Sequence, residues 1–455
     1  MHSHCAHRLN RREFGWTLGL GLLMKSLGTA LRAEEPRSDR SGKKGRTLNK
    51  SEERFLRELQ ERLLRYFVDN QVKKNGFVFD RQRNHGAPRE NGITSSSATG
   101  MGMIAIALAS AKEYGLISAR EAEDRIIKAL EHALKVPEVG GMIAHFFGDD
   151  EKPVATYDAI ATIDSSWLIA GALWSAAFFR SAKITALAKA LHDRVNWRQW
   201  TDAADAVRPD LLRHGMANDG NPLLARWDRL IPESAFMYLI ATGACGTKNV
   251  SRAVWKQLSP HWGQLQGHRL ASSDLGLFAL RWSLLLFDFS PYYFTDGLNL
   301  VHEGDLAAEL NYFTCQALKD VYKTFQTFWG LSAGDGPPEN ETEEEKYREY
   351  APGSTDGTAN ILATVTALEC LTDEVLANLD AAKHHGKIMG RYGPSSVNFA
   401  QRNRFISPYA IGTDVAAAIL AIDNVLYGGR PRRIFEEVPC IIAAREGMRE
   451  YRRAA

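Results

Sequence analysis

Five acidic residues each stand directly before an apolar run of helical length. They are Asp164 before SSWLIAG, Glu233 before SAFMYLI, Asp274 before LGLFAL, Asp356 before GTANILA and Asp414 before VAAAIL. An acid at this place can be a helix cap, worth about 1 kcal/mol, because it suits the free N–H groups and the positive end of the helix dipole. Two such carboxyl groups, one protonated and one ionised, can instead act as a general acid and a general base.

Capping explains Glu233 less well than the other four acids. Glutamate is a poor N-cap by type, and Glu233 follows Pro232, which suits the first turn of a helix. Its longer side chain can reach into a cavity, and the apolar neighbours Phe236 and Met237 favour a raised pKa. Five acids on one rim would also repel one another unless a ligand, protons or basic groups compensate. We therefore expect part of this set to act on a ligand.

The sequence lacks the short motifs of several other chemistries. It has no GxSxG, no P-loop, no HExxH and no GxGxxG between a strand and a helix. Carboxylate chemistry remains, and two acids that flank a bond are what glycoside hydrolysis requires. We expect no metal site and no cofactor.

Four cysteines lie beyond the N-terminal segment, namely Cys245, Cys315, Cys370 and Cys440. They are widely spaced and form no CxxC or CxxH pattern, so the sequence contains neither a zinc nor a redox motif. A large domain does not need disulfides for stability, and buried free thiols are the favoured interpretation. Their pairing stays open.

The helices that carry the acids come in pairs of unlike kind. Residues Ala98–Tyr114 are apolar on nearly every side, as expected of a helix that is buried all round. Residues Ser118–Leu134 place their apolar residues on one stripe with charges opposite, as expected of an outer helix. Further helices are expected at Asp164–Ala182, Glu233–Ala244, Asp274–Phe287, Gly304–Phe328, Gly357–Cys370, Asp373–His385 and Thr413–Tyr427.

This alternation predicts an all-α fold in which an inner ring of helices is wrapped by an outer ring. Strand signals are sparse, with Gly76–Asp80 as one short run, so only minor short β segments are expected in the loops. A helical solenoid would show a repeat of about 34–47 residues, and none is visible. We therefore expect an (α/α)6 barrel, in which parallel inner helices bring their acidic N-termini to one mouth.

The first 33 residues resemble an export signal of the twin-arginine type. Arg11 and Arg12 precede the apolar run Trp16–Met24, and small residues such as Ala30 follow. The run is about half the roughly 20 apolar residues that a membrane span needs. We expect a bacterial periplasmic or secreted protein without a stable membrane span after the signal is removed.

Composition is that of an ordinary soluble globular protein. The 455 residues are 45% apolar and 24% charged, and the net charge of +2 is too small to indicate nucleic acid as a partner. The polar, charged residues 34–50 predict a disordered linker. We expect one barrel domain over residues 51–436 and a C-terminal tail over residues 437–455.

Four short motifs stand out, namely Trp329–Pro337 (WGLSAGDGP), Asp356–Thr358 (DGT), Arg391–Gly393 (RYG) and Gly412–Asp414 (GTD). Together they resemble the glycoamylase-like family, which includes the bacterial endo-β-1,2-glucanases. The likeness runs from about Phe55 to Phe435. It implies an (α/α)6 barrel and an oligosaccharide or polysaccharide as the substrate.

The resemblance also implies roles for single residues. Glu233 would be the general acid, and Asp414 the base acting through water, which gives inversion at the anomeric carbon. Asp164, Asp335 and Asp356 would contact the substrate. Aromatic side chains in the connecting segments, among them Trp329 and Tyr392, offer faces for sugar rings, with packing of the barrel ends as the alternative. The acidic segment 334–353 is either a lid or a solvated loop.

Some family positions have lost polarity in this chain. Ala161 replaces the first acid of a D-L-V-E-T segment and Asp164 its second, and Ser395–Asn398, which includes Ser396, replaces a D-A-F-N stretch that follows Arg-Tyr-Gly in the family. The leading hypothesis is an exported glycoside hydrolase that cleaves a β-glucan, with a β-1,2-linked glucan as the specific case.

Two other functions stay open at this point. One is a non-catalytic glycan-binding or assembly protein on the same fold, which the lost polar residues favour. The other is a polysaccharide lyase, for which His145, His302 and Tyr293 are available as bases.

Overall fold

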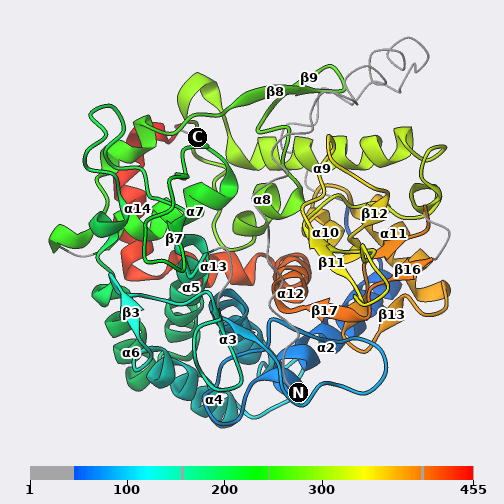
Figure 1. The fold of residues 1–455 in the computed structure, drawn as a ribbon, viewed down its shortest axis with the longest axis horizontal. Coiled ribbons are helices and arrows are strands. Elements are labelled where there is room, and N and C mark those ends of the chain that lie inside the picture. The colour runs from blue at the N-terminus through cyan, green and yellow to red at the C-terminus, as the bar shows by residue number, and fades with distance from the viewer. Residues whose placement is uncertain (1–45, 155–157, 245, 401–403, 454–455) are drawn as a thin grey trace.

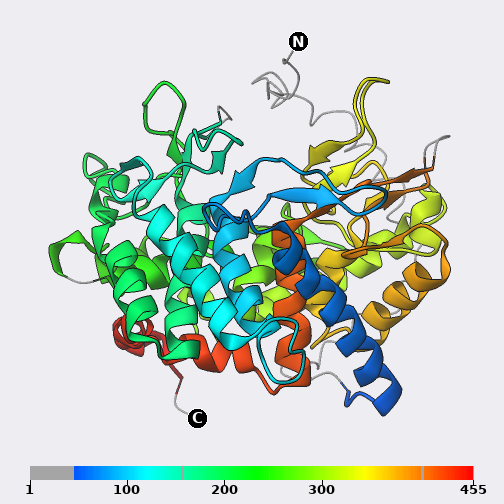
Figure 2. The ribbon, with the colours of Figure 1, turned by 90° about the horizontal axis from the view of Figure 1, so that it is seen from below.

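A computed structural model describes residues 46–154, 158–244, 246–400 and 404–453. Its helices surround a central axis (Figure 1), and the side view in Figure 2 shows them side by side, with strands and long loops at one end. The predicted signal segment, most of the predicted linker and Cys245 lie outside the described residues. Within these ranges, no helix combines the length and the apolarity that crossing a membrane requires.

An inner ring of helices forms the centre of the molecule. Its members in chain order are α3 (Ser96–Ala109), α5 (Thr162–Phe179), α7 (Pro232–Thr242), α8 (Leu277–Arg281) with the 3-10 turn η4 (Trp282–Leu285), α10 (Ile361–Thr364) with η7 (Val365–Ala367), and α12 (Gly412–Leu426). Each member contacts the next, and α12 contacts α3, so the ring closes. The described residues therefore form the predicted (α/α)6 barrel.

Close packing of α3 on α5 depends on two glycines. Every residue of α3 is buried, as the all-round apolar pattern predicted. A Cβ atom added to Gly171 would come within 1.8 Å of the Gly100 carbonyl oxygen, and one added to Gly100 would meet the backbone at Trp167 and Leu168. The two backbones approach so closely only because neither residue has a side chain.

Outer helices cover the inner ring over most of its circumference. They are α2 (Lys50–Asn70), α4 (Ala119–Ala133), α6 (Ala182–Arg194), α9 (Leu300–Ala317) and α11 (Thr372–His384). Asn49 caps α2 by accepting hydrogen bonds from the N–H groups of Ser51 and Glu52. Between α7 and α8 the structure has the 3-10 turns η2 (Gly246–Lys248) and η3 (Arg252–Lys256) and the hairpin β8 (Trp262–Leu265) with β9 (His268–Ala271).

Three helices are shorter than the sequence predicted. The helix expected from Asp274 begins at Leu277, because Gly276 is its N-cap. The helix expected over Gly304–Phe328 ends at Ala317, and η6 (Lys323–Gln326) follows it. The helix expected over Gly357–Cys370 is the short α10 and η7, because Asn360 caps it. Apolar periodicity alone did not reveal these caps.

The residues after 436 fold onto the barrel instead of trailing from it. After α13 (Arg430–Glu436), residues Pro439–Gly447 form α14, which contacts α7 and buries Ile441 and Ala444, and the 3-10 turn η8 (Arg449–Tyr451) follows. In Figure 2 these C-terminal helices lie at the end opposite to the strands. The segment predicted as a tail thus closes that end of the barrel.

Short antiparallel strand pairs hold the loops at the strand-bearing end. They are β1 (Arg81–Arg83) with β17 (Tyr409–Ile411), β2 (Thr94–Ser95) with β5 (Phe146–Phe147), β3 (Glu138–Val139) with β4 (Met142–Ile143), β6 (Ile160–Ala161) with β7 (Gly215–Met216), β10 (Gly334–Gly336) with β11 (Lys346–Arg348), β13 (Met389–Gly390) with β14 (Gly393–Pro394), and β15 (Val397–Asn398) between β12 (Thr358–Ala359) and β16 (Phe405–Ile406). Strands β2, β6 and β17 lead directly into α3, α5 and α12. These pairs therefore fix where the inner helices begin.

Candidate active site

Three of the five acids lie in the first turn of an inner helix. Asp164 is in the first turn of α5, Glu233 in that of α7 and Asp414 in that of α12. None of them is the N-cap residue, since that place is taken by the apolar Ala161, Ile231 and Ile411. A simple capping role therefore does not account for these three side chains.

The other two acids lie before their helices and have local partners. Asp274 is exposed and forms an ion pair with Arg229 at 2.6 Å. Asp356 accepts hydrogen bonds from the N–H and the hydroxyl of Thr358 and thereby holds the turn that enters β12. The carboxyl groups of both acids therefore already have partners within the protein.

Glu233 lies in an apolar and anionic environment. Burial, followed by the negative charges of Asp164 and Glu349, raises the pKa of Glu233 to about 8. Within the described ranges Glu233 forms no ion pair that would oppose this effect. Its carboxyl group therefore carries a proton at neutral pH.

Asp414 has a different set of neighbours. The residue is only 5% exposed and accepts a hydrogen bond of 2.9 Å from the side-chain amide of Asn360. Burial raises the pKa of Asp414 to about 7, with further upward contributions from Asp335 and Asp80, while the bond from Asn360 and the charge of Arg81 act in the opposite direction. Asp414 therefore ionises at a lower pH than Glu233 does.

Arg81 is the cation on the Asp414 side of the mouth. It projects from β1 and contacts Asp335 at 3.1 Å and Glu345 at 3.4 Å. Asp335 is almost fully buried, and its second oxygen accepts a hydrogen bond from Ser407 at 3.0 Å. Both oxygens of the predicted substrate-binding Asp335 are thus bonded within the protein.

The hairpin of β10 and β11 connects the two sides of the mouth. Tyr347 on β11 is 47% exposed, and besides burial the charges of Asp414, Asp80 and Glu349 raise its pKa well above the ordinary value. Glu349 is also one of the charges that raise the pKa of Glu233. The hairpin therefore lies within electrostatic range of both candidate acids.

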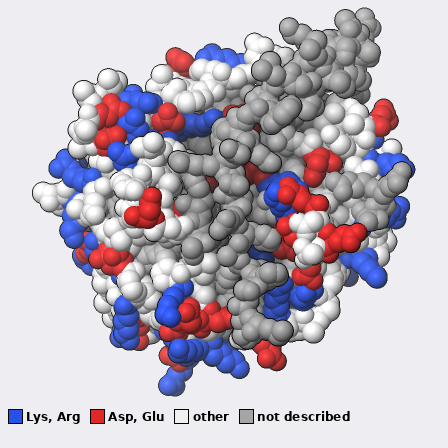
Figure 3. Space-filling model, in the orientation of Figure 1, with Lys and Arg blue, Asp and Glu red and all other residues white. Residues whose placement is uncertain are grey.

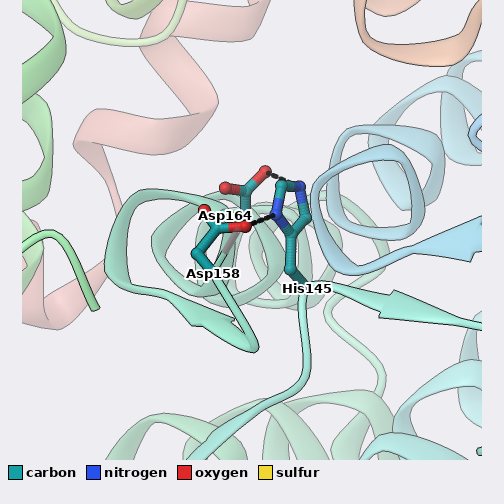
Figure 4. Close-up of side chains that lie close together, drawn as sticks. All are labelled: His145, Asp158 and Asp164. Atoms are coloured by element: carbon teal, nitrogen blue, oxygen red, sulfur yellow. Dashed lines mark hydrogen bonds and ion pairs between the residues drawn. The ribbon is translucent and has the colours of Figure 1, made fainter. Parts of the chain in front are cut away.

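Asp164 forms a cluster with His145 and Asp158 (Figure 4). The imidazole Nδ1 lies 3.0 Å from Asp158 Oδ1, and its Nε2 lies 3.2 Å from Asp164 Oδ1. Burial would lower the pKa of His145, but the two carboxylates outweigh it and raise the pKa to about 10. Burial would likewise raise the pKa of Asp164, but the charge of His145 and hydrogen bonds from His145 and Ser97 hold it below the usual value.

Donor atoms of these three side chains all lie within 4.8 Å of one another, which is close enough to consider a metal ion. The ring, however, directs its two nitrogens to different carboxylates, an arrangement that suits two N–H groups. The geometry therefore favours an imidazolium between two carboxylates. The sequence did not indicate this cluster, because His145 lies far from Asp164 in the chain and the intervening residues match no motif.

Two predicted sugar-stacking residues lie in the core. Trp329 is 2% exposed, and its indole N–H donates a hydrogen bond to the carbonyl oxygen of Glu374. Tyr392 is 1% exposed and packs edge-on against Tyr66. Neither ring offers an open face to a sugar. Both rings pack inside the protein, which was the alternative to sugar stacking.

The structure does not bring the three candidate lyase bases together. His145 is held by the two carboxylates described above. His302 is exposed on the outer helix α9, and Tyr293 lies beneath the guanidinium of Arg453 at 3.9 Å. Of the three, only His145 contacts an acid at the mouth, Asp164, and both of its ring nitrogens are engaged by carboxylates.

Comparison with known proteins supports the resemblance seen in the motifs. Residues 226–436 match the family model described as "Putative glucoamylase". This range contains Glu233 and Asp414, whereas Asp164 and His145 precede it. No curated protein sequence matches the chain significantly.

Solved structures share the fold at low sequence identity. An endo-β-1,2-glucanase from Chitinophaga pinensis, in complex with sophorotriose and glucose, is 18% identical with a TM-score of 0.74, over 87% of this chain and 98% of that one. A glucoamylase-type protein from Bacteroides uniformis is 17% identical with a TM-score of 0.74, over 89% and 98%. The endo-β-1,2-glucanase of Talaromyces funiculosus, in complex with sophorose, is 13% identical with a TM-score of 0.59, over 88% and 89%. The predicted (α/α)6 fold is confirmed.

Proposed function

We propose that this chain, which resembles the glucoamylase-type family over residues 226–436, is a glycoside hydrolase that cleaves a β-glucan. The observation that carries the proposal is the placement of Glu233 and Asp414 in the first turns of two inner helices at one mouth of the barrel, where burial and nearby charges raise their pKa values to about 8 and about 7. Between these two values Glu233 keeps its proton while Asp414 is ionised. This is the division of protons that glycoside hydrolysis requires.

In the proposed reaction each acid has one task. Glu233 donates its proton to the oxygen of the scissile glycosidic bond as that bond breaks. Asp414 accepts a proton from a water molecule, whose oxygen attacks the anomeric carbon from the opposite side and inverts its configuration. Asp164 stays anionic and stabilises the positive charge that develops on the sugar ring.

A β-1,2-linked glucan is the proposed substrate. Two of the structures with this fold are endo-β-1,2-glucanases, and they were determined with sophorotriose and glucose or with sophorose. In the present chain Tyr347 offers a half-exposed aromatic ring at the same mouth, and an aromatic face of this kind binds sugar rings.

Release of reducing ends from purified β-glucans tests the proposal. Wild-type protein should act on β-1,2-glucan, and Glu233→Gln should lower kcat by roughly 10²–10⁴-fold. Asp274→Asn is the matched control, because Asp274 also precedes an apolar helix but its side chain is 62% exposed and paired with Arg229. Absence of hydrolysis by wild type on every β-glucan, or full activity in Glu233→Gln, would refute it.

The stereochemistry of the product tests the role of Asp414. A proton NMR spectrum taken within the first minutes of the reaction should show the α-anomer at the new reducing end, since a β-linkage is attacked with inversion. Initial release of the β-anomer would indicate a covalent intermediate and would exclude the proposed task of Asp414.

A non-catalytic glycan-binding role is the second candidate. Ala161 at the start of α5 carries no polar side chain, although the resembling family has an acid there. Binding of β-1,2-linked oligosaccharides in calorimetry, together with no turnover in wild type, would support this function. Measurable hydrolysis would exclude it.

Export by the twin-arginine route is part of the proposal and rests on the N-terminal sequence, in which Arg11 and Arg12 precede the apolar run Trp16–Met24. A fusion of residues 1–50 to a reporter protein should reach the periplasm of a bacterial host. Replacement of both arginines by lysine should abolish this transport, and unchanged transport would contradict the assigned route.

A further inference from the structure

The cluster of His145, Asp158 and Asp164 lies next to the proposed acid, and of its three members only Asp164 has a task in the reaction proposed above. Asp164 belongs to α5, Asp158 precedes β6, and His145 stands between β4 and β5. Figure 4 shows the imidazole between the two carboxyl groups. Its side chain is 17% exposed, against 25% for Asp158 and 16% for Asp164.

We propose that His145 is a positioning residue that, as a cation held between two carboxylates, fixes the direction and the negative charge of Asp164 beside Glu233. The catalytic part of this inference rests on the function proposed above. The charge state of His145 does not, and it can be measured without any substrate.

Hydrogen-bond geometry carries the first step of the argument. Nδ1 and Nε2 both lie at hydrogen-bond distance from a carboxylate oxygen, at 3.0 Å and 3.2 Å. An ionised carboxylate only accepts hydrogen bonds, and a neutral imidazole has a single N–H group. Both contacts are hydrogen bonds only when the ring carries two protons and is therefore a cation.

The main chain fixes where His145 stands. The Ser96 N–H donates a hydrogen bond of 2.9 Å to the His145 carbonyl oxygen, and the neighbouring residues Thr94 and Ser95 pair with Phe147 and Phe146. The imidazole stacks on the ring of Phe146, with centroids 3.7 Å apart. The ring is thus held on one face and at both nitrogens.

Three groups on other elements complete the surroundings of the cluster. Ser97 on α3 donates a hydrogen bond to Asp164. His214 lies within electrostatic range of Asp158, but burial lowers its pKa, so it brings no positive charge at neutral pH. Glu233 is a further neighbour, and because the negative charge of Asp164 raises its pKa, it brings no positive charge either. His145 is consequently the cation that balances Asp164.

The consequence concerns which acid holds the proton. Asp164 and Glu233 are close enough to influence each other, and two like charges in a buried site cannot both form freely. While the cationic His145 is hydrogen-bonded to Asp164, Asp164 is the ionised acid and Glu233 is the protonated one. Without His145, the proton can reside on either acid, and the proposed proton donor is lost in part of the molecules.

NMR of the full chain labelled with ¹⁵N-histidine tests the charge of His145. The sequence has 13 histidines, so the His145 signal is assigned by its loss in His145→Gln. Both nitrogens should remain protonated up to at least about pH 8.5, given a pKa near 10. Asp164→Asn should lower that pKa by more than one unit.

His214 is an internal control in the same spectra. It stacks on Trp227, with centroids 4.1 Å apart, much as His145 stacks on Phe146, but its ring hydrogen-bonds the main chain at Arg226 rather than a carboxylate. It should be neutral above about pH 6.5. A neutral His145 at pH 7.5 would overturn the inference, and so would a shift of its signals on addition of stoichiometric Zn²⁺, which would indicate a metal site.

Kinetics of Asp158→Asn test the positioning role, because this variant weakens the hold on His145 without changing Asp164 or Glu233. On β-1,2-glucan we expect kcat to fall about tenfold while KM changes less than twofold. Unchanged kcat would overturn the positioning role. Inactive wild-type protein with a cationic His145 would instead refute the proposed function and leave the charge of the cluster established.

Discussion

Glu233 and Asp414 stand at the same mouth of the barrel, but the charges around them differ. The side of α5 and α7 holds Glu233 with the anionic Asp164, and no arginine of the described residues pairs with Glu233, so the pKa of Glu233 rises to about 8. The side of α12 holds Asp414 with Asn360 and Arg81, which restrain the effect of burial, so its pKa rises only to about 7. Burial is the largest contribution on both sides.

This difference shows that neighbouring charges and hydrogen bonds, rather than residue type, decide which acid is the proton donor and which is the base. Burial alone would raise the pKa values of both acids and leave both protonated at neutral pH. Both acids have anionic neighbours that raise their pKa values. The amide of Asn360 and the charge of Arg81 act on Asp414 alone, and they separate the two values. Substitutions at these neighbours should therefore shift the pKa values of Glu233 and Asp414, and the activity that depends on them, in predictable directions.

Removal of the Asp414 carboxylate should have the largest effect. Asp414→Asn should lower kcat on β-1,2-glucan by about 10³-fold, because the side-chain amide cannot accept the proton of the attacking water. The variant should unfold at a urea concentration at least as high as wild type at pH 8, since it removes a charge that burial disfavours. A marked loss of stability would show that Asp414 is mainly structural.

Loss of Arg81 should mainly reduce stability. Arg81→Gln leaves Asp335 buried without its cation, which should lower the free energy of unfolding by about 3–5 kcal/mol in urea titrations. Arg229→Gln is the matched control, because its partner Asp274 is 62% exposed and such a pair contributes about 0–1 kcal/mol. Equal effects of the two substitutions would contradict the different burial of the two pairs.

The pH dependence of kcat/KM should report the order of the two pKa values. Activity should rise as Asp414 ionises near pH 7 and fall as Glu233 loses its proton near pH 8. Asp164→Asn removes a charge that raises the pKa of Glu233, so the alkaline limb should move down by about one unit. An alkaline limb that stays in place, or moves up, would show that Asp164 does not act on Glu233.

Tyr347 should give the smallest of these effects. Tyr347→Ala should raise KM for β-1,2-linked oligosaccharides about fivefold with little change in kcat, which corresponds to the loss of about 1 kcal/mol of stacking. Tyr347→Phe should behave like wild type, because it keeps the ring. A similar rise of KM in Tyr347→Phe would show that the hydroxyl, rather than the ring, contacts the substrate.

On the face that Figure 3 presents, charges of one sign do not gather in one region. Figure 3 shows basic and acidic side chains intermixed on the face that it presents, as expected from the net charge of +2. The uneven distribution of charge that matters for the proposed reaction is therefore local to the barrel mouth.

The helical barrel was predictable because its signals are local. Apolar residues on all sides of residues 98–114, followed by a one-sided helix, require an inner and an outer layer whatever the distant contacts are. That capping explains Glu233 poorly was also predictable, because the argument depends only on the adjacent Pro232. The lengths of α8 and α10 were overestimated. Gly276 and Asn360 are the N-caps of these helices, and apolar periodicity does not reveal N-caps.

The aromatic residues show the limit of such local signals. Trp329 and Tyr392 occur in connecting segments, where an open sugar-binding face is as compatible with the sequence as packing is. The structure buries both rings, because α11 covers Trp329 and Tyr66 of α2 covers Tyr392. Tyr347 came from the same kind of segment and stays half exposed.

By itself, the sequence determined the helices, their layering and the presence of acids at the N-termini of inner helices, because each depends on residues within a few turns of one another. Only the tertiary structure decided which acids keep a proton. Burial and the charges of Asp164, His145 and Arg81 set those pKa values, and these groups come from separate segments that the barrel brings to one mouth.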